Sequence, residues 1–464
     1  MILLGAGGGI LKRTVRRHIS IISIVLLFLQ PMTGYAGALQ EYEEARTLYL
    51  AAVACTAAYS DRVGSISRDA LVQDGWKIQS YVERSNDADA RFLVAEKNQS
   101  GSAIPSYLLS VVGTENIKDV KVDLRVGKVY FAGKNPEEFA ANTLLLDMPD
   151  TVPKVHKGFS QYVQAGLARE LSEQHNNSEK SLVKMLQENK DRKVLLVGHS
   201  LGGAGVTIGG ARLLDMGVRP EQIEVITFGA PAVGNKAFRD KFEPVLHLTR
   251  VVIAGDPVTS ALQKMVGGYE QFGREIRWKN SGAENTDSHQ IISYLDLAIK
   301  NYYQKRQQAI LAGEVSLPNE SISASPSPRV YVAPIENKLP EELQKEFIYM
   351  KEALQDEYRS TLPGYVLGGE DAGEDIFKKA AAANCQWIVM PEIQAYKIKN
   401  EENTSYITLE QRVYQVDSGR AITTTSYGSS TRNLTSLEAL IHNAKEMSKS
   451  RQEWLGHLDK ETKK

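Results

Sequence analysis

Residues 193–203 read KVLLVGHSLGG, and this stretch decides the fold of the first part of the chain. Residues 193–197 form a short apolar run that is typical of a buried strand, and residues 201–216 have the composition of a helix. Ser200 lies between them, flanked by Gly198 and Gly202. The stretch therefore predicts a strand, a sharp turn and a helix, in that order.

Strands and helices alternate on both sides of this turn. Further strands are predicted at residues 76–82, 91–96, 107–112, 223–228 and 248–253, and further helices at 40–60 and 291–311. Apolar strands that alternate with helices form a parallel sheet covered on both faces. The predicted fold class is therefore α/β.

A second, smaller unit follows this region. Residues 314–329 are rich in serine and proline, which is typical of a linker. Beyond it, strands are expected at 330–334 and 387–390, a hairpin at 406–416 and 421–427, and helices at 341–358, 374–383 and 437–455. The predicted organisation is a domain at 39–313, a linker at 314–329, a small α+β domain at 330–455 and a charged tail at 456–464.

The composition excludes some classes of function. The chain of 464 residues has 55 lysines and arginines against 56 acidic residues, so its net charge of −1 disfavours a general nucleic-acid binder. Its two cysteines, Cys55 and Cys385, are too few for a disulfide scaffold and lack the spacing of a zinc site. Cys55 lies on the apolar face of the first helix and is expected to be a buried hydrophobe, and whether the two cysteines pair stays open.

The first 38 residues have the pattern of an export signal. Four basic residues precede an apolar run at 19–29, and they are Lys12, Arg13, Arg16 and Arg17. The small residues Ala36-Gly37-Ala38 follow, so cleavage is predicted after Ala38 and the protein is expected to be periplasmic or secreted. The alternative is an uncleaved amino-terminal anchor, for which the apolar run is short.

The motif around Ser200 predicts a nucleophile. Glycines at 198 and 202 let a serine occupy a strained turn at the start of a helix, where backbone N–H groups can stabilise an oxyanion. A serine needs a base and an acid, and the expected order is met by Asp256, after the strand 248–253, and His289, before the last helix. Each feature has an alternative interpretation. The glycines around Ser200 could form a turn that packs helix on sheet, Asp256 could only shape an Asp-Pro turn, and His289 could be a solvated histidine.

The region of about 40–311 resembles the class 3 lipases, the fungal-type triacylglycerol lipases of the α/β-hydrolase fold. The resemblance rests on segments that match in order: Val111-Val112-Gly113-Thr114, Val155-His156-Lys157-Gly158-Phe159, residues 198–203, Gly229-Ala230-Pro231-Ala232-Val233-Gly234-Asn235, Asp256-Pro257-Val258, a hairpin-like stretch at 269–278, and Ser288-His289-Gln290-Ile291-Ile292-Ser293-Tyr294.

The resemblance implies a role for each matched residue. Ser200 is the nucleophile, His289 the general base and then acid, and Asp256 the carboxylate that orients the imidazole. The N–H groups of Thr114 and Leu201 form the oxyanion hole, and residues 115–124 occupy the position of the lid. It implies no cofactor and no metal, a lipid or small ester as substrate, and transient contact with a membrane surface.

The chain also departs from the family pattern. Val112 and Val120 replace an arginine and a tryptophan near the oxyanion turn, and Gln271 replaces a histidine. His156 is expected to be structural, and His199 to orient the turn by packing.

The second domain resembles small domains of bacterial envelope assembly proteins, such as the amino-terminal domain of TolB. It suggests an envelope protein partner that binds through residues 330–455. The predicted function is that of an exported serine ester hydrolase, a lipase or phospholipase that works through an acyl-enzyme. The alternatives are an envelope acyltransferase with the same triad, or a degenerate lipase fold that serves protein interaction. Acyl chain length, head group and oligomeric state stay open.

Overall fold

A computed structural model describes residues 37–59, 62–84, 89–97, 107–113, 127–145, 147–164, 181–265, 267–280, 287–321, 329–362, 364–369, 375–399, 401 and 404–461. The predicted export signal lies outside these residues except for Gly37 and Ala38, and so does the predicted lid at 115–124. Among the described residues, no helix combines the length and the apolarity that crossing a membrane requires.

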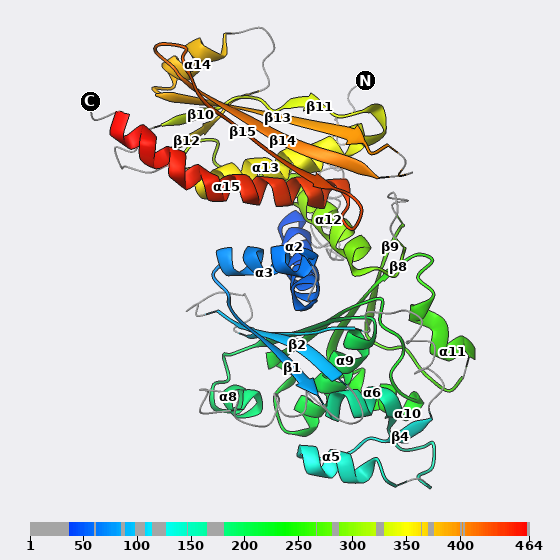
Figure 1. The fold of residues 1–464 in the computed structure, drawn as a ribbon. Helices are drawn as coiled ribbons and strands as arrows, with labels where there is room; N and C mark the ends of the chain where they lie inside the picture. Colours follow the sequence, from blue (N-terminus) through cyan, green and yellow to red (C-terminus); the bar gives the residue numbers. More distant parts are fainter. Residues whose placement is uncertain are drawn as a thin grey trace, which may run out of the picture.

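A seven-stranded sheet forms the first half of the molecule (Figure 1). Its strands are, in spatial order, β1 (Lys77–Arg84), β2 (Asp89–Glu96), β3 (Tyr107–Val111), β6 (Val194–His199), β7 (Ile223–Phe228), β8 (His247–Ile253) and β9 (Arg274–Trp278). β1, β2 and β3 are antiparallel neighbours, and β3, β6, β7, β8 and β9 run parallel. The sheet confirms the predicted α/β-hydrolase class.

Helices cover both faces of this sheet, as its apolar strands require. On one face lie α2 (Ala38–Ala58) and α12 (Ile291–Leu311), which pack on Leu195 and Val197 of β6. On the other face lie α6 (Lys157–Tyr162), α9 (Leu201–Asp215) and α10 (Lys236–Phe242), which pack on Val194 and Leu196. Successive residues of β6 therefore enter opposite cores.

Shorter elements connect these parts. A small sheet pairs β4 (Lys128–Tyr130) with β5 (Lys154–His156). The other connecting helices are α3 (Arg62–Gln73), α5 (Pro136–Asn142), α8 (Leu182–Glu188), α11 (Ala261–Met265) and the 3₁₀ turns η2 (Pro220–Gln222) and η3 (Val258–Ser260).

A six-stranded sheet forms the second half. β10 (Val330–Val332) lies parallel between β12 (Tyr365–Leu367) and β13 (Trp387–Lys397), and β14 (Ser405–Gln415) and β15 (Ala421–Ser430) follow as an antiparallel hairpin. β11 (Glu336–Lys338) also pairs with β13. The helical elements are η4 (Glu341–Glu346), α13 (Phe347–Thr361), α14 (Ile376–Ala382) and α15 (Ser436–Glu461), and this small α+β unit agrees with the expected class.

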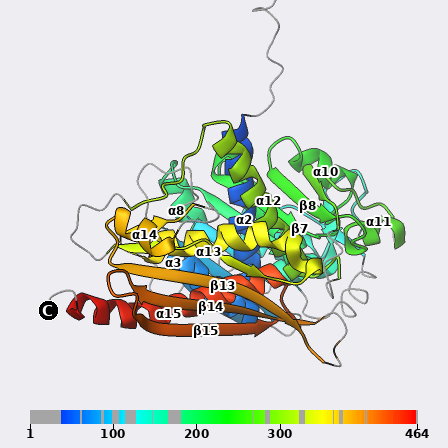
Figure 2. The same cartoon turned by 90° about the horizontal axis from the view of Figure 1, so that it is seen from above.

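The two halves share one apolar core. Helices α2, α3 and α12 lie between the two sheets, facing α13 and α15 (Figure 1). Seen from above, α2 and α12 run side by side and α13 crosses over them (Figure 2). Leu295 and Ile299 of α12 belong to the same buried cluster as Leu354 and Leu440 of the second half. The second half is therefore packed into the first rather than tethered to it.

Charged groups are buried at this junction. Arg306 of α12 is 2% exposed and pairs with Glu352 and, at 2.5 Å, with Asp356 of α13. Asp296 of α12 accepts a hydrogen bond from the Thr435 hydroxyl at 2.8 Å. It also pairs with Lys300, one turn further along the same helix. These contacts fix the angle between α12 and the second half, because buried charges must keep their partners.

The structure corrects several expected elements. Residues 269–278 form no hairpin, since β9 lies parallel to β8 at the edge of the sheet. The helix expected at 341–358 begins as the 3₁₀ turn η4 and becomes α13 only at Phe347. Part of the predicted linker is paired with β12, because Ser321 N–H donates to the Tyr365 carbonyl and Leu367 N–H donates to the Asn319 carbonyl.

The two cysteines are buried and free. Cys55 is fully buried on α2, as its apolar neighbours predict, and burial raises the pKa of its thiol.

Candidate active site

Ser200 lies in a strained turn between β6 and α9. Its φ of 56° is in the left-handed region, which among the described non-glycine residues only Asn384 shares. Glycines make this turn possible: a Cβ at Gly198 would lie 2.3 Å from the Gly202 carbonyl oxygen, and one at Gly202 would lie 2.1 Å from that of Val111. The two glycines of the motif are therefore required by close backbone contacts.

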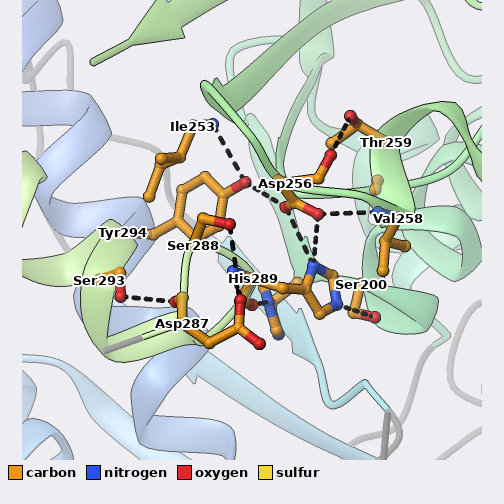
Figure 3. A network of polar contacts seen from close by, with 12 residues as sticks. Ser200, Ile253, Asp256, Val258, Thr259, Asp287, Ser288, His289, Ser293 and Tyr294 are labelled. Atoms are coloured by element: carbon orange, nitrogen blue, oxygen red, sulfur yellow. Dashed lines mark hydrogen bonds and ion pairs between the residues drawn. The ribbon is translucent and has the colours of Figure 1, made fainter. Parts of the chain in front are cut away.

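The fold brings Ser200, His289 and Asp256 together (Figure 3). His289 Nε2 lies 2.9 Å from Ser200 Oγ, and His289 Nδ1 lies 3.0 and 2.9 Å from the two carboxylate oxygens of Asp256. All three residues are buried. Since a carboxylate can only accept, Nδ1 carries the proton and Nε2 is the acceptor for the Ser200 hydroxyl.

Further donors hold the Asp256 carboxylate in place. The Tyr294 hydroxyl donates to Oδ2 at 2.6 Å, and Val258 N–H donates to Oδ1 at 2.9 Å. The same hydroxyl accepts from Ile253 N–H at 3.2 Å. Burial, and then the charge of Asp256, raise the pKa of Tyr294, so that its hydroxyl remains a donor. Sequence reasoning matched Tyr294 to a family segment but gave it no role.

Two loops beside the triad are tightly fitted. Gly229 has a φ of 59°, and a Cβ there would lie 2.6 Å from Asp256 Oδ2 and 3.2 Å from His289 Nδ1. The Gln271 amide donates to the carbonyls of Ala230 and Thr259, at 3.3 and 3.1 Å. Gln271, a departure from the family pattern, thus joins the loop after β7 to the loop that carries Asp256.

The backbone of His289 is held by the segment before α12. Asp287 Oδ1 accepts from His289 N–H at 3.1 Å, and the Ser293 hydroxyl donates to the Asp287 carbonyl at 2.9 Å (Figure 3). His289 is therefore fixed at its ring by Asp256 and at its main chain by Asp287.

Comparison with known proteins identifies this region. Residues 108–265 match the family described as lipase (class 3). This part of the chain is similar to class 3 lipases. Toxin TseL of Vibrio cholerae is 33% identical over 97 residues, which are 21% of this chain and 13% of the toxin. Lipase ZK262.3 of Caenorhabditis elegans is 37% identical over 75 residues, which are 16% of this chain and 21% of that lipase.

The chain thus aligns with less than a quarter of the length of either curated relative. Among solved structures, the Rhizomucor miehei triacylglyceride lipase is 23% identical, with 51% of this chain and 80% of that chain covered and a TM-score of 0.37.

The described residues include part of the oxyanion side of the site. Thr114 lies outside the described residues, whereas Leu201 is the first residue of α9, where N–H groups have no partner within the helix. A Cβ at Gly113 would lie 3.1 Å from Ser200 Cβ, so the end of β3 passes close to the serine. The Val112 carbonyl accepts from the Tyr162 hydroxyl at 2.8 Å, which supports this turn where the family has an arginine.

The other two histidines of the matched motifs have different surroundings. His156 caps α6 by accepting from Phe159 N–H at 3.3 Å, which is a structural role of the kind predicted for it. His199 does more than pack, because both of its ring nitrogens lie within hydrogen-bond distance of other groups. Within the described residues, no group of three or more His, Cys, Asp or Glu side chains could hold a metal ion.

Proposed function

We propose that this protein is a serine ester hydrolase that cleaves lipid carboxylic esters through an acyl-enzyme. The observation that carries the proposal is the pair of contacts made by His289, with Nε2 at 2.9 Å from Ser200 Oγ and Nδ1 on Asp256. The similarity to class 3 lipases supports a lipase-like substrate, and one curated relative is itself named a lipase.

The first half-reaction forms the acyl-enzyme. Ser200 Oγ attacks the carbonyl carbon of the ester while His289 Nε2 takes the hydroxyl proton. The resulting imidazolium is stabilised by the Asp256 carboxylate, which Tyr294 and Val258 N–H hold in place. When the tetrahedral intermediate collapses, the C–O bond to the alcohol breaks and Nε2 returns the proton to the leaving oxygen.

The second half-reaction releases the acid. A water molecule attacks the acyl carbon and gives a proton to His289 Nε2, and the proton then passes to Ser200 Oγ as the acyl–serine bond breaks. Leu201 N–H, at the start of α9, is a donor for the oxyanion in both steps. Together, the two half-reactions convert one ester and one water molecule into one carboxylic acid and one alcohol.

We also propose that the protein is exported, to the periplasm or to the medium. The support is the basic stretch that ends at Arg17, the apolar run at 19–29 and the small residues before position 38. Contact with a membrane surface, and with an envelope protein through residues 330–455, belong to the same proposal.

The test of the proposed chemistry is Ser200→Ala, assayed with short p-nitrophenyl esters and with a fluorophosphonate probe. We expect loss of hydrolysis and of labelling with an unchanged melting temperature, because only the attacking oxygen is removed. Asp256→Asn should lower kcat by about 10⁴, as loss of the orienting carboxylate does in other triads. Near wild-type turnover in Ser200→Ala would overturn the assignment, and transfer of the acyl group to added alcohols would mark an acyltransferase instead.

A further inference from the structure

We infer that His199 is a positioning residue that sets the distance between Ser200 and the main chain of His289. The inference rests on the proposed function, since it concerns the pair of residues that would carry out acyl transfer. Asp256 controls the ring of His289, whereas His199 contacts its backbone. The two contacts therefore act on different degrees of freedom of the same residue.

The contacts of His199 connect three segments that are distant in sequence. Its Nε2 lies 2.6 Å from the His289 carbonyl oxygen, and its Nδ1 lies 2.8 Å from the hydroxyl of Tyr59, which follows α2. The two imidazole rings, of His199 and His289, have centroids 4.8 Å apart. His199 is 5% exposed, so water does not compete effectively for these contacts.

The hydrogen bonds that link Tyr59, His199 and the His289 carbonyl allow one arrangement of their protons. A carbonyl oxygen can only accept, so His199 Nε2 must donate to His289. Burial, and then the neighbouring His289, lower the pKa of His199 to about 3, so the ring is neutral near pH 7. Nδ1 then has a free lone pair, and the Tyr59 hydroxyl donates to it. The His289 carbonyl therefore selects the tautomer of His199, and the Tyr59 hydroxyl completes it by donating to Nδ1.

Because a peptide bond joins His199 to Ser200, the hydrogen bond from His199 to the His289 carbonyl restrains the distance between Ser200 and the main chain of His289. His199 is bonded directly to Ser200, so the base and the nucleophile are linked through one imidazole ring and one peptide unit. Moving His289 away from Ser200 must lengthen the contact between His199 Nε2 and the His289 carbonyl. A Cβ at Gly113 would lie 2.6 Å from the His199 carbonyl oxygen and 3.2 Å from Tyr59 Oη, so these groups also border the oxyanion turn.

The test compares His199→Phe with His199→Gln in the full chain, using p-nitrophenyl ester kinetics. Phenylalanine fills the space without a donor, whereas the glutamine amide has a donor and an acceptor in the 1,3 relation of the ring nitrogens. We expect His199→Phe to lower kcat by about 10- to 100-fold with KM within about twofold, since a misplacement of about 1 Å costs about 10² in rate. His199→Gln should recover most of this loss.

The double variant tests the chain of contacts. If Tyr59 acts through His199, then Tyr59→Phe should lower kcat by a smaller factor, and Tyr59→Phe with His199→Phe should be no slower than His199→Phe alone. His156→Phe is the matched control, because it removes another buried histidine that caps a helix. It should lower the melting temperature and leave kcat unchanged.

Two results would overturn the inference. One is a wild-type kcat in folded His199→Phe, and the other is an equal loss in the Phe and Gln variants. If His199→Phe does not fold, Tyr59→Phe decides: a reduced kcat at unchanged KM supports the inference, and a wild-type kcat contradicts it. Failure of the proposed function looks different, because the wild-type protein would then be inactive and Ser200 would not react with the fluorophosphonate.

Discussion

At the scale of single residues, the site depends on how many donors reach one buried carboxylate. Asp256 accepts from His289 Nδ1, from Val258 N–H and from the Tyr294 hydroxyl. Each donor stabilises the charged acid, and their directions fix the plane in which the imidazole of His289 lies. Tyr294 is also on the first turns of α12, so the acid is oriented by the helix that follows the base.

Tyr294→Phe should reduce activity through Asp256. The substitution removes the 2.6 Å donor to Oδ2 and leaves Ile253 N–H without that acceptor. Because a hydrogen bond to a charged group contributes about 1.5–3 kcal/mol, we expect kcat to fall about tenfold or more and the melting temperature to decrease. Steady-state kinetics with p-nitrophenyl esters measures the first effect.

Tyr358→Phe is the control for this prediction. Its hydroxyl donates to Gln411 at 3.2 Å within the second half of the molecule. That variant should lose stability and keep its kcat. If Tyr294→Phe behaves in the same way, Tyr294 has no role in orienting Asp256.

At the scale of elements, the sequence predicts long periodic segments well and short ones poorly. α12 has the bounds expected from its apolar spacing, and β7 follows its apolar run. β12 has only three residues after Gly364, too few for any periodicity to appear, and was not predicted. β9 is an edge strand whose residues are mostly exposed, and the hairpin expected at 269–278 came from the likeness to a family motif rather than from the spacing of apolar residues.

Within the site, too, sequence patterns predict some residues and not others. Motif and chain order were enough to name Ser200, Asp256 and His289, which the fold brings within hydrogen-bond distance. The roles of Tyr294 and Gln271 could not be predicted, because their contacts bridge loops whose approach depends on the whole sheet.

Glu438→Gln should change the pH dependence of stability at the start of α15. Glu438 and Thr435 form a capping box, in which Glu438 Oε2 accepts from Thr435 N–H at 2.8 Å. Burial, and then the charge of Asp296, raise the pKa of Glu438 well above 4.5, while Thr435 and Lys300 oppose the shift. Its contribution to stability is therefore present at low pH and is lost as pH rises through the raised pKa.

Glutamine keeps the acceptor of the cap but cannot ionise, so the variant should gain stability over the wild type as pH rises from about 4.5, the ordinary pKa of glutamate, through the raised pKa of Glu438. Urea unfolding at a series of pH values from mildly acidic to mildly basic measures the difference. Glu446→Gln, at a surface pair with Lys449 on the same helix, should leave the pH dependence unchanged. Parallel curves for Glu438→Gln and the wild type would contradict the assignment.

At the scale of the whole molecule, the shared core makes the two halves one unit of stability. Helices α2 and α12 contact the first sheet on one side and the second half on the other. Thr435 of the second half binds Asp296, seven residues after His289. The position of the base is therefore supported by residues from both halves.

Arg306→Met should destabilise both halves together. The substitution keeps the apolar stem but leaves the buried carboxylate of Glu352 without its cation, whereas Asp356 still pairs with Arg359. Removal of one partner of a buried ion pair costs about 3–5 kcal/mol. Calorimetry should show one transition that moves to lower temperature, whereas two separated transitions would contradict a shared core. Arg432→Met, at a surface pair with Glu401, should shift it little.

The strap formed by Asn319 and Ser321 along β12 matters for anyone who divides this protein into fragments. A truncation at residue 313 would remove the strap and the second sheet together. It would leave Leu295, Ile299 and Tyr303 of α12 facing water beside an unpaired Arg306. Such a fragment would aggregate. A lack of ester hydrolysis by it would then reflect insolubility and not the loss of a catalytic residue. Chemistry in this protein is best dissected by single substitutions in the intact chain.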